Sequence, residues 1–202
     1  MKTVILYIIC AVISYLIGSV SISILLSKYV YGKDVRSGGS GNAGATNVTR
    51  TFGFSAGILT FLGDFGKAIL ALWLSKLVGG SIAMAIGGFS CLLGHCFPIY
   101  FHFKGGKAVS CGAAVALMID WRIMVIALAV FVIAVLISKT VSIASIAATA
   151  SVGVGTVLLA QNVPALLLGI ASCILVIFMH RSNIARIIQG TEPQFRAGSA
   201  KR

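Results

Sequence analysis

The sequence predicts an all-α integral membrane protein, a seven-transmembrane helical bundle with short or broken helices at its cytoplasmic face. Hydrophobic residues make up 58% of the 202 residues and charged residues only 10%, whereas about a quarter of the residues in a soluble domain are charged. Apolar blocks follow one another from residue 3 to residue 179, and basic residues are concentrated between alternate blocks. A soluble domain is therefore excluded, and we expect residues 1–202 to form a single membrane-embedded domain.

A helix that spans a bilayer needs about 20 mostly apolar residues, with a tolerated range of about 17 to 25. The candidate spans are residues 3–27, 51–75, 77–101, 108–119, 123–138, 140–160 and 163–179. The first is longer than the core of a signal peptide, about 7 to 15 residues, and no cleavage site follows it, so we expect it to be retained. The fourth is too short to cross comfortably, and we expect it to begin below the membrane surface.

Two other counts of spans are possible. A single helix over 108–138 would bury Asp120 and Arg122, each at about 2.5 to 3.5 kcal/mol near a helix centre. A fourth segment that re-enters without crossing would spread the basic residues almost evenly over both sides. Both alternatives are less consistent with the charge pattern than seven spans.

Seven spans place the termini on opposite sides, so each basic residue can be assigned. Lys67 lies inside the second span, and the amino-terminal side carries Lys2, Lys76 and Arg122. The other side carries Lys28, Lys33, Arg36, Arg50, Lys104, Lys107, Lys139, Arg181, Arg186, Arg196, Lys201 and Arg202. By the positive-inside rule the richer side is cytoplasmic, which places the N-terminus outside and the C-terminus in the cytoplasm. The net charge of +12 then indicates anionic lipid or an anionic substrate rather than nucleic acid.

The loop between the first two spans contains the sequence RSGGSGNAGATN. Glycine lets backbone amides turn toward an anion, hydroxyl and amide side chains add neutral donors, and arginine adds a forked cation. The candidate phosphate ligands here are Arg36, Ser40, Gly41, Asn42, Thr46 and Asn47. A plain connector between helices is the alternative, and the loop does not match the Walker pattern.

A second polar stretch follows the third apolar block, which Pro98 is expected to break or kink. Lys104 and Lys107 bracket Gly105 and Gly106 at the start of the next helix. The free amides and the dipole of a helix N-terminus favour a bound anion at such a position. The alternative is a basic turn that lies on anionic lipid.

The third stretch leaves the last span at His180. If the helix continues past residue 179, His180 and Asn183 share one face, with Arg186 close to it. His180 is the best candidate for a general base, because its ordinary pKa is near neutrality. One alternative is an amphipathic side chain placed at the interface without a catalytic role, and another is that the phosphate of a substrate accepts the proton.

Other polar residues lie inside the spans. Asp64 and Lys67 are three residues apart in the second span, where we expect an ion pair or a role in the site. Ser142, just inside the sixth span, can donate to a ligand or serve close helix packing. No group of His, Cys and acidic residues has metal-ligand spacing, so we expect neither a metal nor another cofactor.

Taken together, RSGGSGNAGATN, GHCFPIYFHFKGGKAV and HRSNIARIIQGTEPQF resemble the three signature motifs of the bacterial acyl-phosphate:glycerol-3-phosphate acyltransferase family, the PlsY type. The similarity extends over most of the chain, including residues 15–19 and 63–67. It implies transfer of a fatty acyl group from acyl phosphate to the 1-hydroxyl of glycerol 3-phosphate, giving lysophosphatidic acid and inorganic phosphate. This is the first acylation step of phospholipid synthesis, in the bacterial plasma (inner) membrane. The implied partners are glycerol 3-phosphate, acyl phosphate and membrane lipid, and we expect a monomer.

The resemblance also implies roles for individual residues. It makes Arg36 and Ser40 the critical members of the first motif, and it makes His180 and Asn183 necessary for catalysis. In the second motif, glycerol 3-phosphate would be held by Lys104, Gly105, Gly106 and Lys107. Glu192 would be mainly structural. The sequence departs from the family pattern at Ala108, where the family usually has another glycine.

Two functions of other classes remain as alternatives. A transporter for phosphate-bearing solutes would use broken helices, but the polar groups gather at one face and no internal repeat is visible. A phosphotransferase with a nucleotide-linked donor would need an acidic metal-binding cluster, which the four acidic residues do not form. An acyl phosphate is an activated mixed anhydride, so orientation and charge stabilisation can supply most of its reactivity without a covalent nucleophile.

Overall fold

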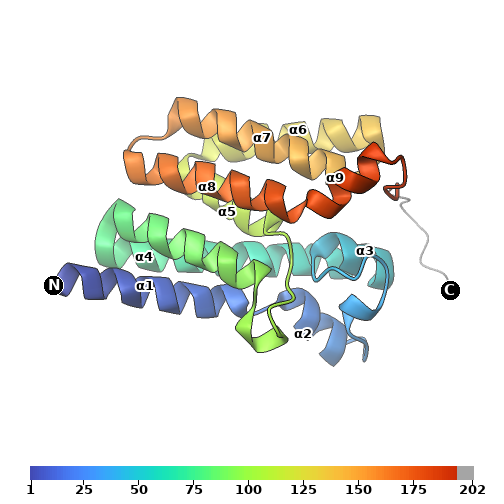
Figure 1. Ribbon diagram of the computed structural model, residues 1–202, viewed down its shortest axis with the longest axis horizontal. Helices are drawn as coiled ribbons and strands as arrows, with labels where there is room; N and C mark the ends of the chain where they lie inside the picture. The colour runs from blue at the N-terminus through green and yellow to red at the C-terminus, as the bar shows by residue number, and fades with distance from the viewer. Residues whose placement is uncertain (195–202) are drawn as a thin grey trace.

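The apolar blocks form helices that run along one common axis, with shorter helices gathered at one end (Figure 1). This computed structural model describes residues 1–194, and no strand occurs among them. The helices are α1 Lys2–Ser19, α2 Ile22–Tyr29, α3 Ala45–Phe52, α4 Phe54–Cys96, α5 Val109–Ile119, α6 Trp121–Ser138, α7 Val141–Leu159, α8 Val163–Met179 and α9 Arg181–Ile188. Two short 3-10 helices, Val35–Ser37 and Ile99–Phe101, lie in the loops. The all-α prediction is confirmed.

Within residues 1–194, the helices differ in their ability to cross a membrane. By length and composition four candidate spans qualify, and a fifth is added when α8 and α9, which meet at a 54° bend, are counted as one. The segment Phe54–Phe101 is one of the four, although α4 doubles back on itself. Helix α5, with 11 residues, is too short to cross alone, as expected from the sequence.

The turn inside α4 lies at Gly79 and Gly80, not at the predicted boundary near Lys76. Gly80 has φ 67° and ψ −155°, a conformation that is open almost only to glycine. The two arms then run antiparallel, so that Gly87 lies against Ser75 and Gly88 against Leu72. The position of the turn is therefore set by the residue that can adopt it.

The first apolar block is not one helix, contrary to the expectation for residues 3–27. Helix α1 ends at Ser19, and Ser21 is extended before α2 begins at Ile22. The Lys67 side chain donates a hydrogen bond to the Val20 carbonyl at 2.5 Å, which satisfies backbone at the break. Tertiary contact from α4 thus stabilises an interruption that the apolar pattern does not reveal.

Two further boundaries also differ from the predicted spans. The second span was expected to begin at residue 51, but α3 ends at Phe52 and Gly53, with φ 98°, separates it from α4. The third span was expected to reach residue 101, but α4 ends at Cys96 because Pro98 disfavours helix in the residue before it. Both arms of α4 are therefore shorter than predicted at the end of the bundle where the short helices lie.

The chain turns between α5 and α6 at Asp120, as the seven-span interpretation requires. The Asp120 carboxylate accepts a hydrogen bond from the Arg122 amide at 2.8 Å and caps α6. Its other oxygen pairs with the Arg122 guanidinium at 2.8 Å. A single helix over 108–138 is therefore wrong.

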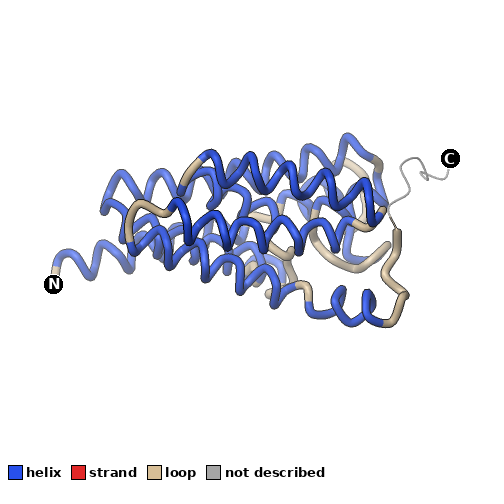
Figure 2. The backbone as a smooth tube through the Cα atoms, turned by 90° about the horizontal axis from the view of Figure 1, so that it is seen from above, coloured by secondary structure: helices blue, strands red, loops and turns tan. Residues whose placement is uncertain are grey.

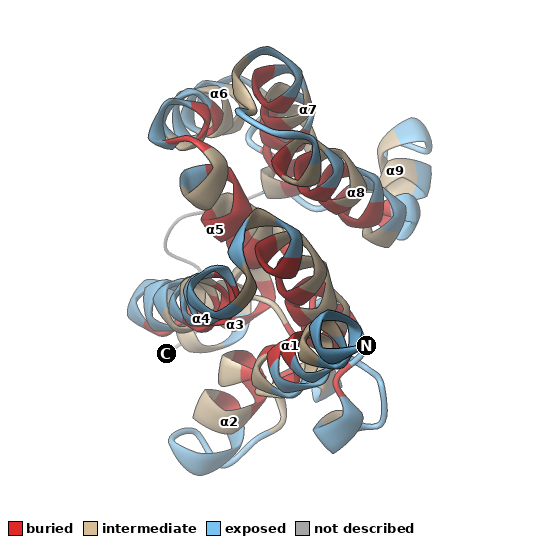
Figure 3. Cartoon of the chain, turned by 90° about the vertical axis from the view of Figure 1, so that its left-hand side faces the viewer, coloured by how far each residue is buried: buried red, intermediate tan, exposed pale blue. Residues whose placement is uncertain are grey.

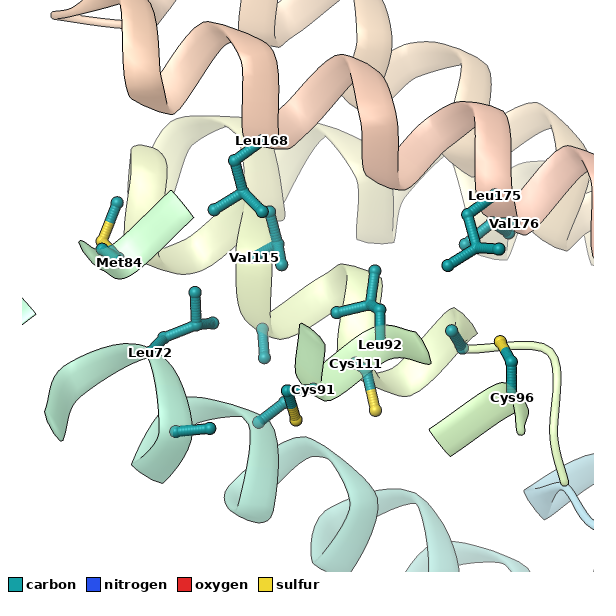
Figure 4. Packing of buried hydrophobic residues seen from close by; sticks show 14 residues of the cluster. Leu72, Met84, Cys91, Leu92, Cys96, Cys111, Val115, Leu168, Leu175 and Val176 are labelled. Atoms are coloured by element: carbon teal, nitrogen blue, oxygen red, sulfur yellow. The ribbon is translucent and has the colours of Figure 1, made fainter. Parts of the chain in front are cut away.

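The core lies where α4, α5 and α8 meet, and Figure 4 shows its side chains converging from these helices. Its largest fully buried members are Leu72, Leu92, Val115 and Leu168. The outward helix faces are exposed, as the view along the bundle shows (Figure 3), and they carry many large hydrophobic side chains. Side chains such as Leu62, Val132 and Leu158 are suited to contact lipid tails on these faces.

Helices α1 and α4 approach closely enough for their backbones to touch. A Cβ atom on Gly18 would lie 2.1 Å from the Cys91 carbonyl oxygen, and one on Gly94 would lie 2.2 Å from the Tyr15 carbonyl oxygen. Small residues at a helix interface permit this kind of contact inside a membrane. The glycines therefore determine how α1 packs on the bundle.

Basic residues collect at one end of the bundle, where α2, α3, α9 and the long loops lie (Figures 1 and 2). The opposite end has Lys2, Lys76 and Arg122, at the start of α1, near the turn of α4 and at the start of α6. Arg196, Lys201 and Arg202 lie outside the described residues. The predicted separation of basic residues is thus confirmed for residues 1–194, and we call the richer end the polar end.

Replacing Gly18 with Ala should lower the free energy of unfolding by about 1 to 3 kcal/mol, because the new methyl group overlaps backbone of α4. Thermal unfolding in detergent micelles measures the change. Gly66→Ala is the matched control, since a Cβ on this helical glycine meets nothing within 4 Å. The control should stabilise the protein by about 0.5 to 1 kcal/mol through helix propensity. Equal stabilisation by both variants would show that α1 and α4 leave room for a methyl group at Gly18.

Candidate active site

A cavity of about 520 Å³ opens at the polar end and extends between the helices. Its polar lining comes from the first loop, α3, the start of α5, the start of α7 and the segment around α9. Its apolar lining comes from deeper positions, among them Ile58, Phe61, Leu128, Phe131 and Val152. The cavity is thus amphipathic, with hydrogen-bonding groups at one end and hydrocarbon at the other.

His180 lies at the bend between α8 and α9 and lines this cavity. Its Nδ1 lies 2.8 Å from the Val176 carbonyl oxygen, which can only accept, so Nδ1 carries the hydrogen. Nε2 of the neutral ring is therefore an acceptor. The helix does not continue straight past residue 179, but Asn183, in α9, still lines the same cavity. The third motif therefore contributes both residues to one cavity.

Glu192 joins three of the predicted residues through hydrogen bonds. Its Oε1 accepts from Ser142 Oγ and from Asn183 Nδ2, both at 2.7 Å. Its Oε2 accepts from Arg186 Nε at 2.7 Å. The Asn183 side-chain oxygen in turn accepts from Lys107 Nζ. This arrangement, which we call the Glu192 network, holds α5, α7 and α9 together at the cavity mouth.

Charge in the Glu192 network is set by burial and by these contacts. Burial raises the pKa of Glu192, but hydrogen bonds from Ser142, Asn183 and Arg186 outweigh it and the pKa lies below its ordinary value. Burial lowers the pKa of the Lys107 ammonium to about 8, with Glu192 opposing this shift. Near neutral pH the cavity mouth therefore contains a carboxylate and a cation.

The Gly105–Gly106 turn is held by the end of α4. The Gly105 amide donates to the Cys96 carbonyl at 3.1 Å and the Gly106 amide donates to the His95 carbonyl at 3.0 Å. A Cβ on Gly105 would lie 2.1 Å from that His95 oxygen. These two amides are therefore occupied, and the glycines are needed for close backbone approach.

Amides without an intrahelical acceptor are found instead at the start of α5. Val109 and Ser110 line the cavity, and the first-turn amides of a helix have no intrahelical acceptor. Ala108 precedes them with φ 59°, a left-handed conformation that glycine adopts without strain. This conformation explains why a glycine, as in the family pattern, suits the position of Ala108. Lys107 lines the cavity beside these amides, whereas the Lys104 side chain is exposed and lies outside the cavity lining.

Arg36 clamps two loops together. Its guanidinium pairs with the Asp34 carboxylate, with Nη2 and Oδ2 2.8 Å apart, and lowers the pKa of Asp34 to about 2. Its Nη1 donates to the carbonyl oxygens of Phe101 at 3.0 Å and of Lys104 at 3.3 Å. Arg36 lies outside the cavity lining, so its contacts position the first and second motifs relative to each other.

Asn47 organises the first loop from a buried position. Its Oδ1 accepts from the Ser40 amide at 2.9 Å. Its Nδ2 donates to the carbonyl oxygens of Val35 at 2.9 Å and Asn42 at 3.0 Å. Ser40, Asn42 and Thr46 line the cavity, and Gly41, with φ 70°, forms the turn between the first two.

Two lining residues with basic side chains, Arg50 and His95, were not predicted from the sequence as site residues. Arg50 lies one helical turn after Thr46 on α3, and this i, i+4 spacing places both on one face. His95 comes from the end of α4, next to the predicted ion pair. That pair is confirmed, because Lys67 Nζ lies 2.9 Å from Asp64 Oδ1. Asp64 lines the cavity, whereas Lys67 lies behind it.

The chain is similar to known proteins over most of its length. Residues 8–190 match the family model described as glycerol-3-phosphate acyltransferase. The glycerol-3-phosphate acyltransferase of Finegoldia magna is 39% identical over 186 residues, covering 92% of this chain and 94% of the relative. That of Carboxydothermus hydrogenoformans is 35% identical over 185 residues, with the same coverage of 92% and 94%.

Two solved structures also match. The glycerol 3-phosphate form of PlsY, an integral membrane glycerol 3-phosphate acyltransferase, is 33% identical with a TM-score of 0.89, covering 94% of this chain and 96% of that chain. The lysophosphatidic acid form is 30% identical with a TM-score of 0.86, covering 95% and 96%. The identity, the nearly complete coverage and the shared membrane fold show that this chain belongs to the PlsY-type family of glycerol-3-phosphate acyltransferases.

Proposed function

We propose that this protein transfers a fatty acyl group from acyl phosphate to the 1-hydroxyl of glycerol 3-phosphate, forming lysophosphatidic acid and inorganic phosphate. The amphipathic cavity is the observation that carries the proposal. It brings cations and helix-start amides together with a hydrocarbon-lined extension. One reactant is a small polyol phosphate and the other is a phosphate on a fatty chain, and the cavity offers a matching environment for each.

The polar end suits the phosphate groups. Lys107 and Arg50 supply positive charge, and Val109 and Ser110 contribute helix-start amides. Ser40, Asn42 and Thr46 add neutral hydroxyl and amide groups at the mouth. The Glu192 network restrains Lys107 through one hydrogen bond, from Lys107 to Asn183. An ammonium has three donors, so Lys107 can still donate to a phosphate.

His180 is the proposed acceptor of the hydroxyl proton. As the glycerol oxygen forms its bond to the acyl carbonyl carbon, the bond from that carbon to the phosphate oxygen breaks. The phosphate leaves with the electron pair, and the hydroxyl proton passes to His180 Nε2. Since phosphate is a competent leaving group, the enzyme needs no covalent intermediate. Arg36 supports this reaction by fixing the two loops relative to each other. Ser40 and Asn183 line the cavity, where they can contact the substrates.

The distribution of basic residues supports a cytoplasmic active site, with the N-terminus outside the cell, in the inner membrane of a bacterium. Both substrates then reach the cavity at the inner leaflet. We further propose that the chain acts as a single acyltransferase domain, because residues spread along it from Ser40 to Glu192 line one cavity.

The donor is tested with purified protein in detergent. We expect phosphate release and lysophosphatidic acid formation from palmitoyl phosphate, both dependent on glycerol 3-phosphate. Palmitoyl-CoA and palmitoyl-acyl carrier protein, at the same concentration, should give no product. Product from either thioester but not from palmitoyl phosphate would overturn the donor assignment. Counterflow of glycerol 3-phosphate in vesicles without any acyl product would indicate a transporter.

Replacing His180 with Gln should lower kcat by at least about 100-fold, since glutamine retains hydrogen bonding but cannot accept the proton. His102→Gln is the matched control, because His102 is exposed and lies outside the cavity lining. Steady-state assays with palmitoyl phosphate measure both variants. Near-normal turnover in His180→Gln would exclude the general-base role.

The charge of Lys107 should appear in the pH profile. Because the Lys107 ammonium loses its proton near pH 8, kcat/KM for glycerol 3-phosphate should fall as the pH rises through about 8. Lys107→Arg keeps its charge over this range, so this variant should lack that alkaline decline. Profiles of kcat/KM at constant ionic strength test this, and an identical decline in both proteins would assign it to another group.

A further inference from the structure

A buried cluster of three ionisable side chains borders the cavity on the α4 side. It consists of Asp64, Lys67 and His95, each no more than 9% exposed. Lys67 Nζ lies 2.9 Å from Asp64 Oδ1 and 2.5 Å from the Val20 carbonyl oxygen, so most of its hydrogen-bonding capacity is used inside the protein. His95 also lines the cavity. One of its two ring nitrogens, Nε2, has no hydrogen-bond partner among residues 1–194.

The contact with Lys67 determines which ring nitrogen of His95 carries hydrogen. His95 Nδ1 lies 3.1 Å from Lys67 Nζ. An ammonium has donors and no acceptor, so Nδ1 of a neutral ring accepts from Lys67 and the hydrogen of that ring is on Nε2. In a protonated ring Nδ1 carries a hydrogen and faces Asp64 Oδ1, 3.6 Å away. If the ring were protonated, Nε2 would carry a hydrogen as well. In either charge state Nε2 is a donor.

The Nε2 edge of the ring faces the Gly105–Gly106 turn. A Cβ on Gly106 would lie only 2.2 Å from His95 Nε2, so the glycine makes room for this atom. Among residues 1–194 no hydrogen bond engages Nε2, although the residue is 5% exposed and lines the cavity. Gly106 directly precedes Lys107 and the start of α5. The free donor therefore lies beside the proposed phosphate site.

We propose that His95 is a further substrate-binding residue, whose Nε2–H donates a hydrogen bond to a phosphoryl oxygen at the start of α5. The proposal rests on the function proposed above. It deepens that function by giving the two cavity histidines opposite tasks. His180 Nδ1 donates to the Val176 carbonyl and leaves Nε2 as an acceptor, whereas Lys67 holds His95 with Nε2 as a donor. Lys67 acts here as a positioning residue.

Kinetics of two His95 variants test the contact. His95→Leu removes the donor and should raise KM roughly 10- to 100-fold for the substrate whose phosphate it binds, as expected for a hydrogen bond to a charged group. His95→Gln restores an N–H near the same place and should recover most of that loss. Measuring KM for glycerol 3-phosphate and for palmitoyl phosphate separately identifies which phosphate is bound. Unchanged KM for both substrates in His95→Leu, or equal impairment of KM in the Leu and Gln variants, would overturn the proposal.

A binding measurement decides the point without turnover, and it uses the wild-type chain. In protein labelled with ¹⁵N-histidine, NMR should show a hydrogen on His95 Nε2, and in neutral His180 a hydrogen on Nδ1 and none on Nε2. Addition of inorganic phosphate, or of glycerol 3-phosphate, should shift the His95 Nε2–H signal and leave exposed His102 unchanged. Substitution of each histidine assigns the signals. A His95 ring that is unprotonated at Nε2, or that responds to neither anion, would refute the proposal even if the acyltransfer assay succeeded.

If instead the acyltransfer assay failed and the His95 signal still responded, the site would bind phosphate but the proposed reaction would be wrong. The two hypotheses can therefore fail separately. The His102→Leu variant provides the matched kinetic control, because this residue is exposed and outside the cavity lining. Its KM values should equal those of the unmodified protein.

Discussion

The contact between the Gly105–Gly106 turn and the C-terminal end of α4 is the constraint on which the rest of the site depends. The two glycine amides satisfy carbonyls of Cys96 and His95 that the end of α4 leaves free. A side chain at either glycine would collide with His95. Because the turn lies so close, Lys107 and the first turn of α5 are brought to the cavity instead of the membrane surface. Arg36 holds the same turn from the other side through the Lys104 carbonyl.

The position of Lys107 in the cavity lining requires polar partners for its charge. Lys107 would be a poorly solvated cation if it stood alone, and the Glu192 network gives it a polar partner in Asn183. Arg186 pairs with the Glu192 carboxylate. Lys107 and Arg50 therefore leave positive charge available to an incoming phosphate. Phosphate binding would replace solvent around these cations, and the burial that lowers the pKa of Lys107 also strengthens its attraction to an anion.

The same cavity is also suited to the acyl transfer proposed for this membrane protein. A fatty chain needs hydrocarbon surroundings and its phosphate needs donors, and a helical bundle meets both needs only near the end of its helices. Short α5 and bent α8–α9 create that position, because α5 begins beside the cavity at Val109 and α8 ends beside it at the bend by His180.

The sequence alone determined the membrane class, most helices, the segregation of basic residues and the three polar stretches that meet at one site. These features depend on apolar length, charge and local residue type, which are readable along the chain. Tertiary structure decided the break after Ser19, the turn at Gly79 and Gly80, and the separate roles of the motif residues. The amides of Gly105 and Gly106 donate to backbone carbonyls of α4 and not to a ligand. The side-chain amide of Asn47 likewise donates to backbone carbonyls of its own loop. His95 was missed because its hydrogen is placed by Lys67, 28 residues away. Which group is left free to meet a ligand depends on partners distant in sequence, and only the folded chain brings those partners within hydrogen-bonding distance.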